Sequence, residues 1–174
     1  MNAFFNINTL RRFLVLATIS FWLGGFTFYA GVVVPIGMRI LGSHLRQGFI
    51  TQEVSRWINV AGVAAIIVLA WNTRVLFKNS NAVLRYLLGG SLMVITLFQI
   101  ELFVLHPFLD RLLDAKAHRL IDGDSFDLLH RIYLGSATLQ WGVGVLHVFC
   151  IAAASEAPAT VALTADTDRG SASV

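Results

Sequence analysis

The sequence predicts an all-α integral membrane protein, a bundle of four transmembrane helices. Three observations predict this fold. The 174-residue chain is 56% hydrophobic and has a mean hydropathy of +0.71. Only 13% of its residues are charged, whereas a soluble domain carries about 25%. Finally, four long apolar runs occur along the chain, and because backbone groups in lipid must be paired within their own segment, each run should be a helix.

Each apolar run is long enough to cross a bilayer, whose hydrocarbon layer of about 30 Å takes roughly 20 helical residues. The spans are expected at about residues 12–36, 56–78, 83–106 and 127–154. The first run is expected to be a retained span, because its apolar stretch exceeds the roughly 7–15 residues of a signal peptide and no small-x-small pair stands near its end.

The connections between the spans differ in length. Residues 37–56 are expected to form a polar loop that contains His44, Arg46 and Gln47, and Thr51 is a candidate helix N-cap. Asn79–Ser80–Asn81 predicts a tight turn. Residues 107–126 are the longest connection, and Pro107 suits the first turn of a new helix. This segment predicts either an amphipathic interfacial helix or a continuation of span three beyond the lipid.

The chain is expected to form one four-span transmembrane domain over residues 1–155, followed by a disordered polar tail over residues 156–174. We expect it in a bacterial inner membrane with both termini in the cytoplasm, because basic residues beside short loops count most in the positive-inside rule.

The composition also narrows the partners. The formal charge of +3 is too small to predict nucleic-acid binding, and the lone Cys150 excludes an internal disulfide. The predicted partner is the lipid bilayer, and the Gly-rich faces favour association with a second copy of the chain or with other membrane subunits.

Polar side chains form stripes inside two of the apolar runs. In span four, residues at alternating spacings of three and four share one face, and span three carries a matching stripe. Because these spans run in opposite directions, their polar ends should meet at one membrane surface. The predicted polar cluster contains His106, Asp110, Asp127, His130 and Tyr133, with Gln99 and Gln140 on the same stripes.

Three interpretations of this cluster stay open. Two imidazoles with carboxylates suit Zn, Mn or Fe, with His106, His130, Asp110 and Asp127 as candidate ligands. Histidine beside aspartate also suits the movement of protons or solutes, and the same residues could simply pair with one another at the interface. Because His106 precedes Pro107, which disfavours helical geometry, a break there would remove the alignment with Asp110.

No cofactor is predicted, with a divalent metal or haem b as the alternative. A single haem would have to lie between His106 and His130. The sequence contains no Gly-rich phosphate loop, G-x-S-x-G elbow, H-E-x-x-H pair or C-x-x-C pair. No enzymatic activity is therefore predicted.

Short motifs resemble a family of small membrane proteins that includes human transmembrane protein 205. They are Phe21–Trp22–Leu23–Gly24–Gly25–Phe26 with Val34–Pro35–Ile36, then Leu105–His106–Pro107, and Phe126–Asp127–Leu128–Leu129–His130 followed by Tyr133 and Gln140. The resemblance covers about residues 10–154 and implies a four-helix membrane domain of unestablished activity.

The Trp22–Gly24–Gly25 opening is also similar to small membrane haem-pathway oxidases and copper-resistance membrane domains. Those groups carry a histidine one or two turns before the tryptophan. Here Val15–Leu16–Ala17–Thr18 stands in that stretch, which argues against an equivalent redox site.

From the sequence we therefore predict a multi-pass membrane protein with a structural role or a role in handling small solutes or ions. The alternative is a metal- or haem-binding redox protein that uses the same polar cluster.

Overall fold

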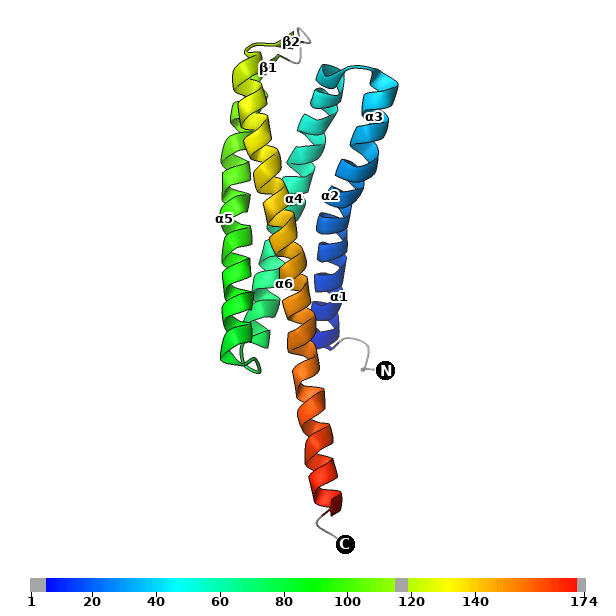
Figure 1. Cartoon of the computed structure of the whole chain (residues 1–174), viewed down its shortest axis with the longest axis vertical. Coiled ribbons are helices and arrows are strands. Elements are labelled where there is room, and N and C mark those ends of the chain that lie inside the picture. Colours follow the sequence, from blue (N-terminus) through cyan, green and yellow to red (C-terminus); the bar gives the residue numbers. More distant parts are fainter. Residues whose placement is uncertain (1–5, 115–118, 172–174) are drawn as a thin grey trace.

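The computed structural model is an elongated bundle of four helical rods (Figure 1). It describes residues 6–114 and 119–171, with side chains for 6–113 and 120–155. Four of its helices are long and apolar enough to cross a membrane by length and composition, so the predicted four-helix bundle is confirmed. The elements in chain order are α1 (Ile7–Ile19), η1 (Ser20–Gly24), α2 (Gly25–Phe28), η2 (Tyr29–Val33), α3 (Val34–Leu41), α4 (His44–Leu76), α5 (Ala82–Leu112), β1 (Leu113–Asp114), β2 (Arg119–Leu120) and α6 (Gly123–Ser171).

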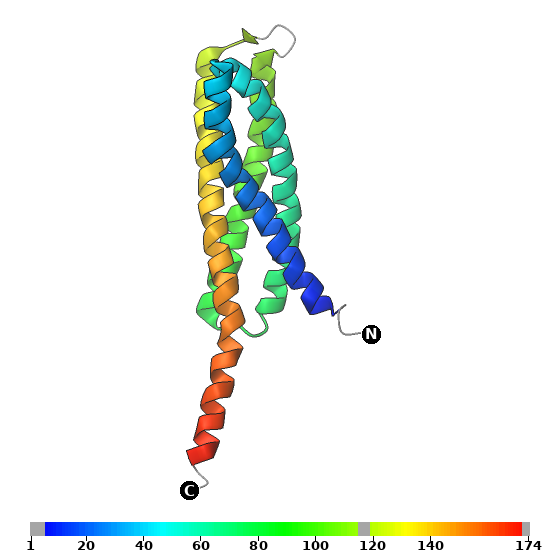
Figure 2. The same ribbon diagram turned by 90° about the vertical axis from the view of Figure 1, so that its right-hand side faces the viewer.

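The first rod runs from Ile7 to Leu41 and contains two π-helical segments, η1 and η2. In Figure 2 this rod slants across the bundle, so that its first turns stand apart from α6. Pro35 lies in the first turn of α3. Proline donates no N–H, and its ring crowds the carbonyl four residues earlier. The wider π-helical turn of η2, directly before α3, accommodates the proline ring without ending the rod.

The connection between α3 and α4 is much shorter than the sequence predicts. The polar loop expected at residues 37–56 is wrong, because α3 continues to Leu41 and α4 begins at His44. Gly42 takes a left-handed φ of 58°, which glycine adopts without strain. The Ser43 side chain then accepts from the Arg46 N–H at 3.4 Å and caps α4. Thr51 is therefore no N-cap, and its hydroxyl donates to the Gln47 carbonyl inside the helix at 3.0 Å.

The predicted turn at Asn79–Ser80–Asn81 is confirmed between α4 and α5. The Ser80 hydroxyl donates to the Leu76 carbonyl at 2.8 Å, and the Asn81 side chain accepts from the Leu84 N–H at 2.9 Å. These bonds satisfy backbone groups that the two helix ends would otherwise leave unpaired.

The interfacial helix expected within residues 107–126 is not formed by the described residues. Instead α5 continues through Pro107 to Leu112, which agrees with the other expectation, a continuation of span three. The chain then reverses through the antiparallel pair β1–β2, and residues 115–118 lie outside the described residues. Because α5 is unbroken at Pro107, His106 and Asp110 keep their one-turn spacing.

Asp122 caps the start of α6. Its carboxylate accepts from the Ser125 N–H at 3.2 Å and from the Ser125 hydroxyl at 2.6 Å. These hydrogen bonds favour the ionised carboxylate and hold the pKa of Asp122 below its usual value. A negative charge also suits the N-terminus of a helix.

The last helix is longer than the sequence predicts. The structure continues α6 to Ser171, where the sequence predicts a disordered polar tail over residues 156–174, of which 172–174 lie outside the described residues. This extension leaves the bundle and projects past the α4–α5 turn (Figures 1 and 2). Its sequence is rich in alanine, the residue with the highest helix propensity.

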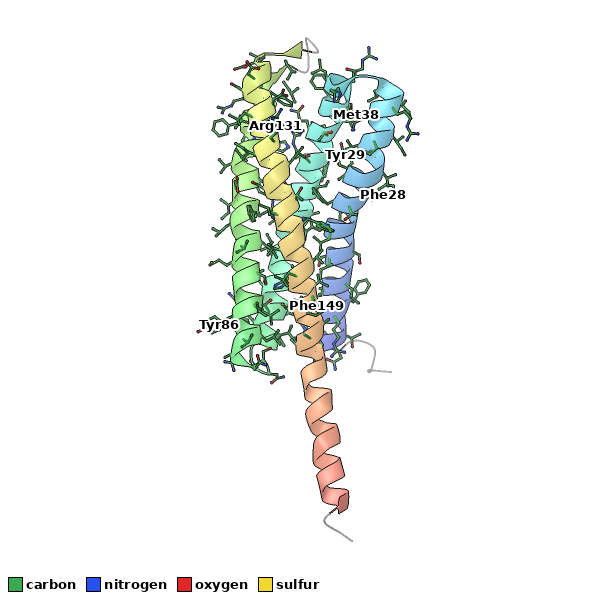
Figure 3. All side chains as sticks on the ribbon, viewed as in Figure 1. Phe28, Tyr29, Met38, Tyr86, Arg131 and Phe149 are labelled. Atoms are coloured by element: carbon green, nitrogen blue, oxygen red, sulfur yellow. The ribbon has the colours of Figure 1, made fainter. Side chains whose placement is uncertain are left out.

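The outer surface of the bundle is apolar. Large side chains such as Phe28, Tyr86 and Phe149 are 60%, 82% and 71% exposed, and Figure 3 shows how such side chains surround the rods. The interior combines aliphatic clusters with buried amides, hydroxyls and one imidazole. Trp22 and Val15 of the first rod pack there with Ala65 and Leu69 of α4.

Gly62 is a close-packing position between the first rod, α4 and α5. A Cβ added there would meet the Gln99 side-chain oxygen and lie 3.0 Å from Trp22 Nε1. We expect Gly62→Ala to lower the free energy of unfolding by about 1–3 kcal/mol through overpacking, measured by thermal or denaturant unfolding in detergent. The control is Gly90→Ala on α5, where a Cβ would meet nothing within 4 Å; it should be neutral or stabilising. Equal losses in both variants would contradict this account.

Candidate functional site

A partly enclosed cavity of about 820 Å³ lies inside the bundle, at the end where α3 joins α4 and where α6 begins. All four rods contribute to its wall. Tyr29 and Met38 of the first rod line it near the upper end in Figure 3. The wall is mostly apolar, with aromatic side chains from Trp22, Phe26, Phe126 and Trp141.

The structure brings most of the sequence-predicted cluster to this cavity. The predicted residues that line it are His106, Asp110, Asp127, His130, Tyr133 and Gln140. Gln99 is not part of the lining, but its side-chain oxygen accepts a hydrogen bond from Gln140 Nε2 at 3.0 Å. The antiparallel pairing of α5 and α6 therefore gathers the two polar stripes as the sequence predicts.

His106 and Asp110 form a polar pair in the wall of the cavity. His106 Nδ1 lies 3.1 Å from Asp110 Oδ2, across one turn of α5. The other ring nitrogen, Nε2, lies 3.2 Å from the Gln52 carbonyl oxygen on α4. These two contacts, one to each ring nitrogen, fix the orientation of the imidazole between α4 and α5. Arg56 lies 3.8 Å from the same Asp110 oxygen.

A chain of hydrogen bonds closes the inner end of the cavity. Asn59 Nδ2 donates to the Tyr133 hydroxyl at 3.0 Å. Gln99 Nε2 donates to the Asn59 carbonyl at 3.4 Å. Gln140 Nε2 donates both to Gln99 Oε1 at 3.0 Å and to the Ile95 carbonyl at 3.1 Å. The chain joins α4, α5 and α6, and the Ser55 side chain is a second hydrogen-bond partner of the Tyr133 hydroxyl.

A second polar group lies on the first rod and α4. The Tyr29 hydroxyl donates to Thr51 Oγ1 at 2.9 Å, and Gln47 Nε2 donates to the Tyr29 hydroxyl at 3.5 Å. Gln47 is buried, and its Oε1 has no hydrogen-bond partner. That oxygen packs against Gly37, where a Cβ would collide with it.

The remaining predicted residues have separate surroundings. The His130 ring stacks on Phe126, with centroids 5.5 Å apart and planes 9° apart. The His106 ring instead meets Tyr133 edge-on, at a centroid distance of 6.3 Å. Asp127 lines the cavity beside His130.

The metal interpretation receives no geometric support from this arrangement. Among the described residues, no group of three or more His, Cys, Asp or Glu side chains could hold a metal ion. The proposed ligands His106, His130, Asp110 and Asp127 share a cavity, but they are not gathered into one coordination shell.

His147 lies on the same stripe of α6 as Gln140 but is completely buried beyond the inner end of the cavity. Its Nδ1 lies 2.7 Å from the Ser91 hydroxyl and its Nε2 lies 3.3 Å from the Thr73 hydroxyl. Both ring nitrogens are thus occupied, and the imidazole joins α4, α5 and α6 as a structural group.

The contribution of α4 is not predicted from the sequence, because a loop is expected over residues 37–56 and no site role is assigned to Asn59 in span two. The missed polar residues of the cavity are His44, Gln47, Thr51, Gln52, Ser55 and Asn59. A signal for them was present: Gln47, Thr51, Ser55 and Asn59 recur every four residues, a spacing that places side chains on one face of a helix.

No protein-family model, curated protein or solved structure matches the chain. The resemblance to the family of transmembrane protein 205 therefore stays a prediction, as does the weaker similarity to haem-pathway oxidases and copper-resistance domains.

The Tyr133 hydroxyl is the acceptor for a buried amide. We expect Tyr133→Phe to lower the free energy of unfolding by about 1–3 kcal/mol, because Asn59 Nδ2 loses its partner. Thermal unfolding in detergent measures the change. Tyr86→Phe is the matched control, since Tyr86 is 82% exposed and should tolerate the loss of its hydroxyl. A Tyr133→Phe protein as stable as the Tyr86→Phe protein would contradict this role.

Proposed function

We propose that the chain is a multi-pass membrane protein that binds a small, largely apolar molecule with a hydrogen-bonding head. The observation that carries this proposal is the cavity of about 820 Å³, with its aromatic wall and its convergent polar groups. Ligand sites are typically about 300–1,000 Å³, mostly apolar, with a few polar groups that fix orientation.

Membrane insertion is supported by the inverted distribution of polarity. The four candidate spans have hydropathies between 1.6 and 1.9, and their outward side chains include Phe13, Phe21 and Ile67, each more than 60% exposed. Amides and hydroxyls such as Asn59, Gln99 and Ser91 are buried instead. In a bilayer this arrangement solvates the apolar surface with lipid and pairs the polar groups inside the bundle.

The charged residues agree with a bilayer around the middle of the bundle. The α4 sequence has no charged residue between Arg56 and Arg74, and the α6 sequence has none between Arg131 and Glu156. Glu101 of α5 is the exception, and its Oε1 accepts a hydrogen bond from the Ser136 hydroxyl at 2.8 Å. Carboxyl groups within a span are costly and are usually paired in this way.

The polar groups of the cavity suggest the chemistry of the ligand. Asp110 places a carboxylate, which accepts hydrogen bonds, in the cavity wall, and the Tyr133 hydroxyl oxygen can accept as well. Gln47 Oε1 is buried without a donor, although it is packed against Gly37. A ligand with an aromatic or aliphatic body and a hydroxyl or amide head matches this set.

We further propose a bacterial inner membrane as the location, with both termini in the cytoplasm. The short α4–α5 turn is flanked by Arg74, Lys78 and Arg85, and basic residues beside a short loop favour the cytoplasmic side. The cavity would then open toward the opposite, extracytoplasmic surface.

Ligand binding can be tested with 1-naphthol and naphthalene, which share one aromatic body and differ in the hydroxyl head. We expect 1-naphthol to change the fluorescence of Trp22 and Trp141, which line the cavity, and to raise the unfolding temperature of the detergent-purified protein. Naphthalene should bind at least about fivefold more weakly, since a lost hydrogen bond contributes about 1 kcal/mol.

A matched pair of variants locates the binding. Ala137→Phe places a ring into the cavity wall and should abolish 1-naphthol binding. Leu139→Phe adds a ring on the same helix at a side chain that is 59% exposed and should bind normally. Equal binding by the two folded variants, or no binding by the unmodified chain, would refute the cavity as the site.

The topology can be tested with single cysteines in a Cys150→Ala chain. We expect a membrane-impermeant maleimide to label Arg46→Cys and Asp124→Cys in intact spheroplasts, because both exposed positions lie at the cavity end. Asn79→Cys, in the α4–α5 turn, should be labelled only after permeabilisation. The reverse pattern would place the termini outside, and labelling of all sites in a soluble fraction would contradict membrane insertion.

A further inference from the structure

Among the side chains that the structure describes, the end of the bundle opposite the cavity carries basic groups and no carboxylate. The cationic side chains at this end are Arg11, Arg12, Arg74, Lys78 and Arg85. The carboxylates among the described side chains lie elsewhere, with Glu101 along α5 and Glu53, Asp110, Asp122, Asp124 and Asp127 toward the cavity end. An anion at this end would therefore meet no described carboxylate.

Arg11 is the unusual member of this group. Its side chain is only 8% exposed, and its Nε and Nη1 are buried without a hydrogen-bond partner. Guanidinium nitrogens that are buried without a partner are strongly unfavourable unless a counter-charge satisfies them. Arg85, by contrast, donates from Nε to the Ser80 carbonyl at 2.8 Å, and Arg12 is exposed.

A second orphan donor lies on the facing helix. Asn72 of α4 is 4% exposed, and its Nδ2 has no hydrogen-bond partner. Val15, one turn after Arg11, and Leu69, one turn before Asn72, belong to the same buried cluster. Arg11 and Asn72 therefore continue the facing stripes of α1 and α4 toward the same end of the bundle.

We propose that Arg11, together with Asn72, binds a phosphate group at this end of the bundle, and that an anionic lipid headgroup supplies it. A guanidinium donates to phosphate oxygens in a bidentate manner, and Asn72 adds a neutral donor. Exposed Ile7 and Phe13 flank Arg11, so acyl chains would pack beside a headgroup held there. Basic pockets between membrane helices bind headgroups in this way.

This inference rests on the proposed membrane insertion and is independent of the cavity at the other end. It also assigns a different role to each of two adjacent arginines. Arg11 is a specific ligand to phosphate, whereas Arg12 contributes only to the general attraction of the surface. Inorganic phosphate offers the same oxygens without the acyl chains, so it distinguishes the two sources of the group.

The experiment uses the full chain in neutral detergent and a phosphate-free buffer. Phosphatidylglycerol, phosphatidylcholine or inorganic phosphate is added in increasing amounts, and the unfolding temperature of the protein is measured at each concentration. We expect phosphatidylglycerol to stabilise the protein and phosphatidylcholine not to. Arg11→Met should weaken the apparent affinity for phosphatidylglycerol about tenfold or more, as expected for charged hydrogen bonds. Arg12→Met, the matched control, should weaken it less than about threefold.

A reversal of stability provides the second readout. Without anionic lipid, Arg11→Met should unfold at a higher temperature than the unmodified chain, because an unpaired buried charge has been removed; with phosphatidylglycerol the order should invert. Arg11→Lys keeps the charge without the planar fork and should bind with intermediate affinity, which keeps the test valid if Arg11→Met fails to fold.

Three outcomes would overturn the proposal. Equal weakening by the Met substitutions at Arg11 and Arg12 would mean diffuse attraction, and equal stabilisation by the two lipids would mean no selectivity for the anion. Stabilisation by inorganic phosphate as strong as that by phosphatidylglycerol would overturn the lipid as the source, while leaving Arg11 as the phosphate ligand. None of these results bears on naphthol binding in the cavity.

Discussion

The hydrogen-bond chain from Tyr133 through Asn59 and Gln99 to Gln140 is the interaction on which the rest of the structure depends. In the bilayer that we propose, lipid is as apolar as the outer side chains, so the helices would gain little by burying more apolar surface against one another. Polar contacts and close packing would then fix their relative positions. This chain fixes α4, α5 and α6 at one height. Gly62 lets Gln99 and Trp22 approach the α4 backbone, which brings the first rod into the same layer.

The two ends of the bundle follow from this central layer in different ways. Toward the α3–α4 connection, the helices diverge around polar side chains and leave the cavity, whose wall Tyr29, His106 and His130 share. Toward the α4–α5 turn, Ser91, Thr73 and His147 close the interior, and basic residues surround the periphery. The ligand that we propose for the cavity and the phosphate group that we propose beside Arg11 would therefore bind at opposite ends of the bundle.

The fold was largely predictable, because it is indicated by the composition of long segments and by the helical spacing of the polar residues within them. The four apolar runs placed the helices, and the stripe in span four placed His130, Tyr133 and Gln140 on the cavity side. The ends of the helices were less predictable. The left-handed Gly42 and the Ser43 cap reverse the chain within two residues. No pattern in residues 44–56 requires a loop there. Pro107 was equally ambiguous, because neighbouring helices allow proline within an apolar helix. The pairing of Asn59 with Tyr133 depends on the relative height of α4 and α6, which no local pattern encodes.

The π-helical segments of the first rod have an evolutionary consequence. A π-turn holds one more residue than an α-helical turn over the same stretch, so a relative with a straight first helix would be shorter by one residue at η1 and at η2. An alignment that forbids gaps inside helices would then pair Trp22 and Tyr29 with the wrong positions. An alignment of this region with distant homologues therefore requires single-residue gaps near Gly24 and Gly31. Hydropathy alone would treat the whole segment as one uninterrupted helix.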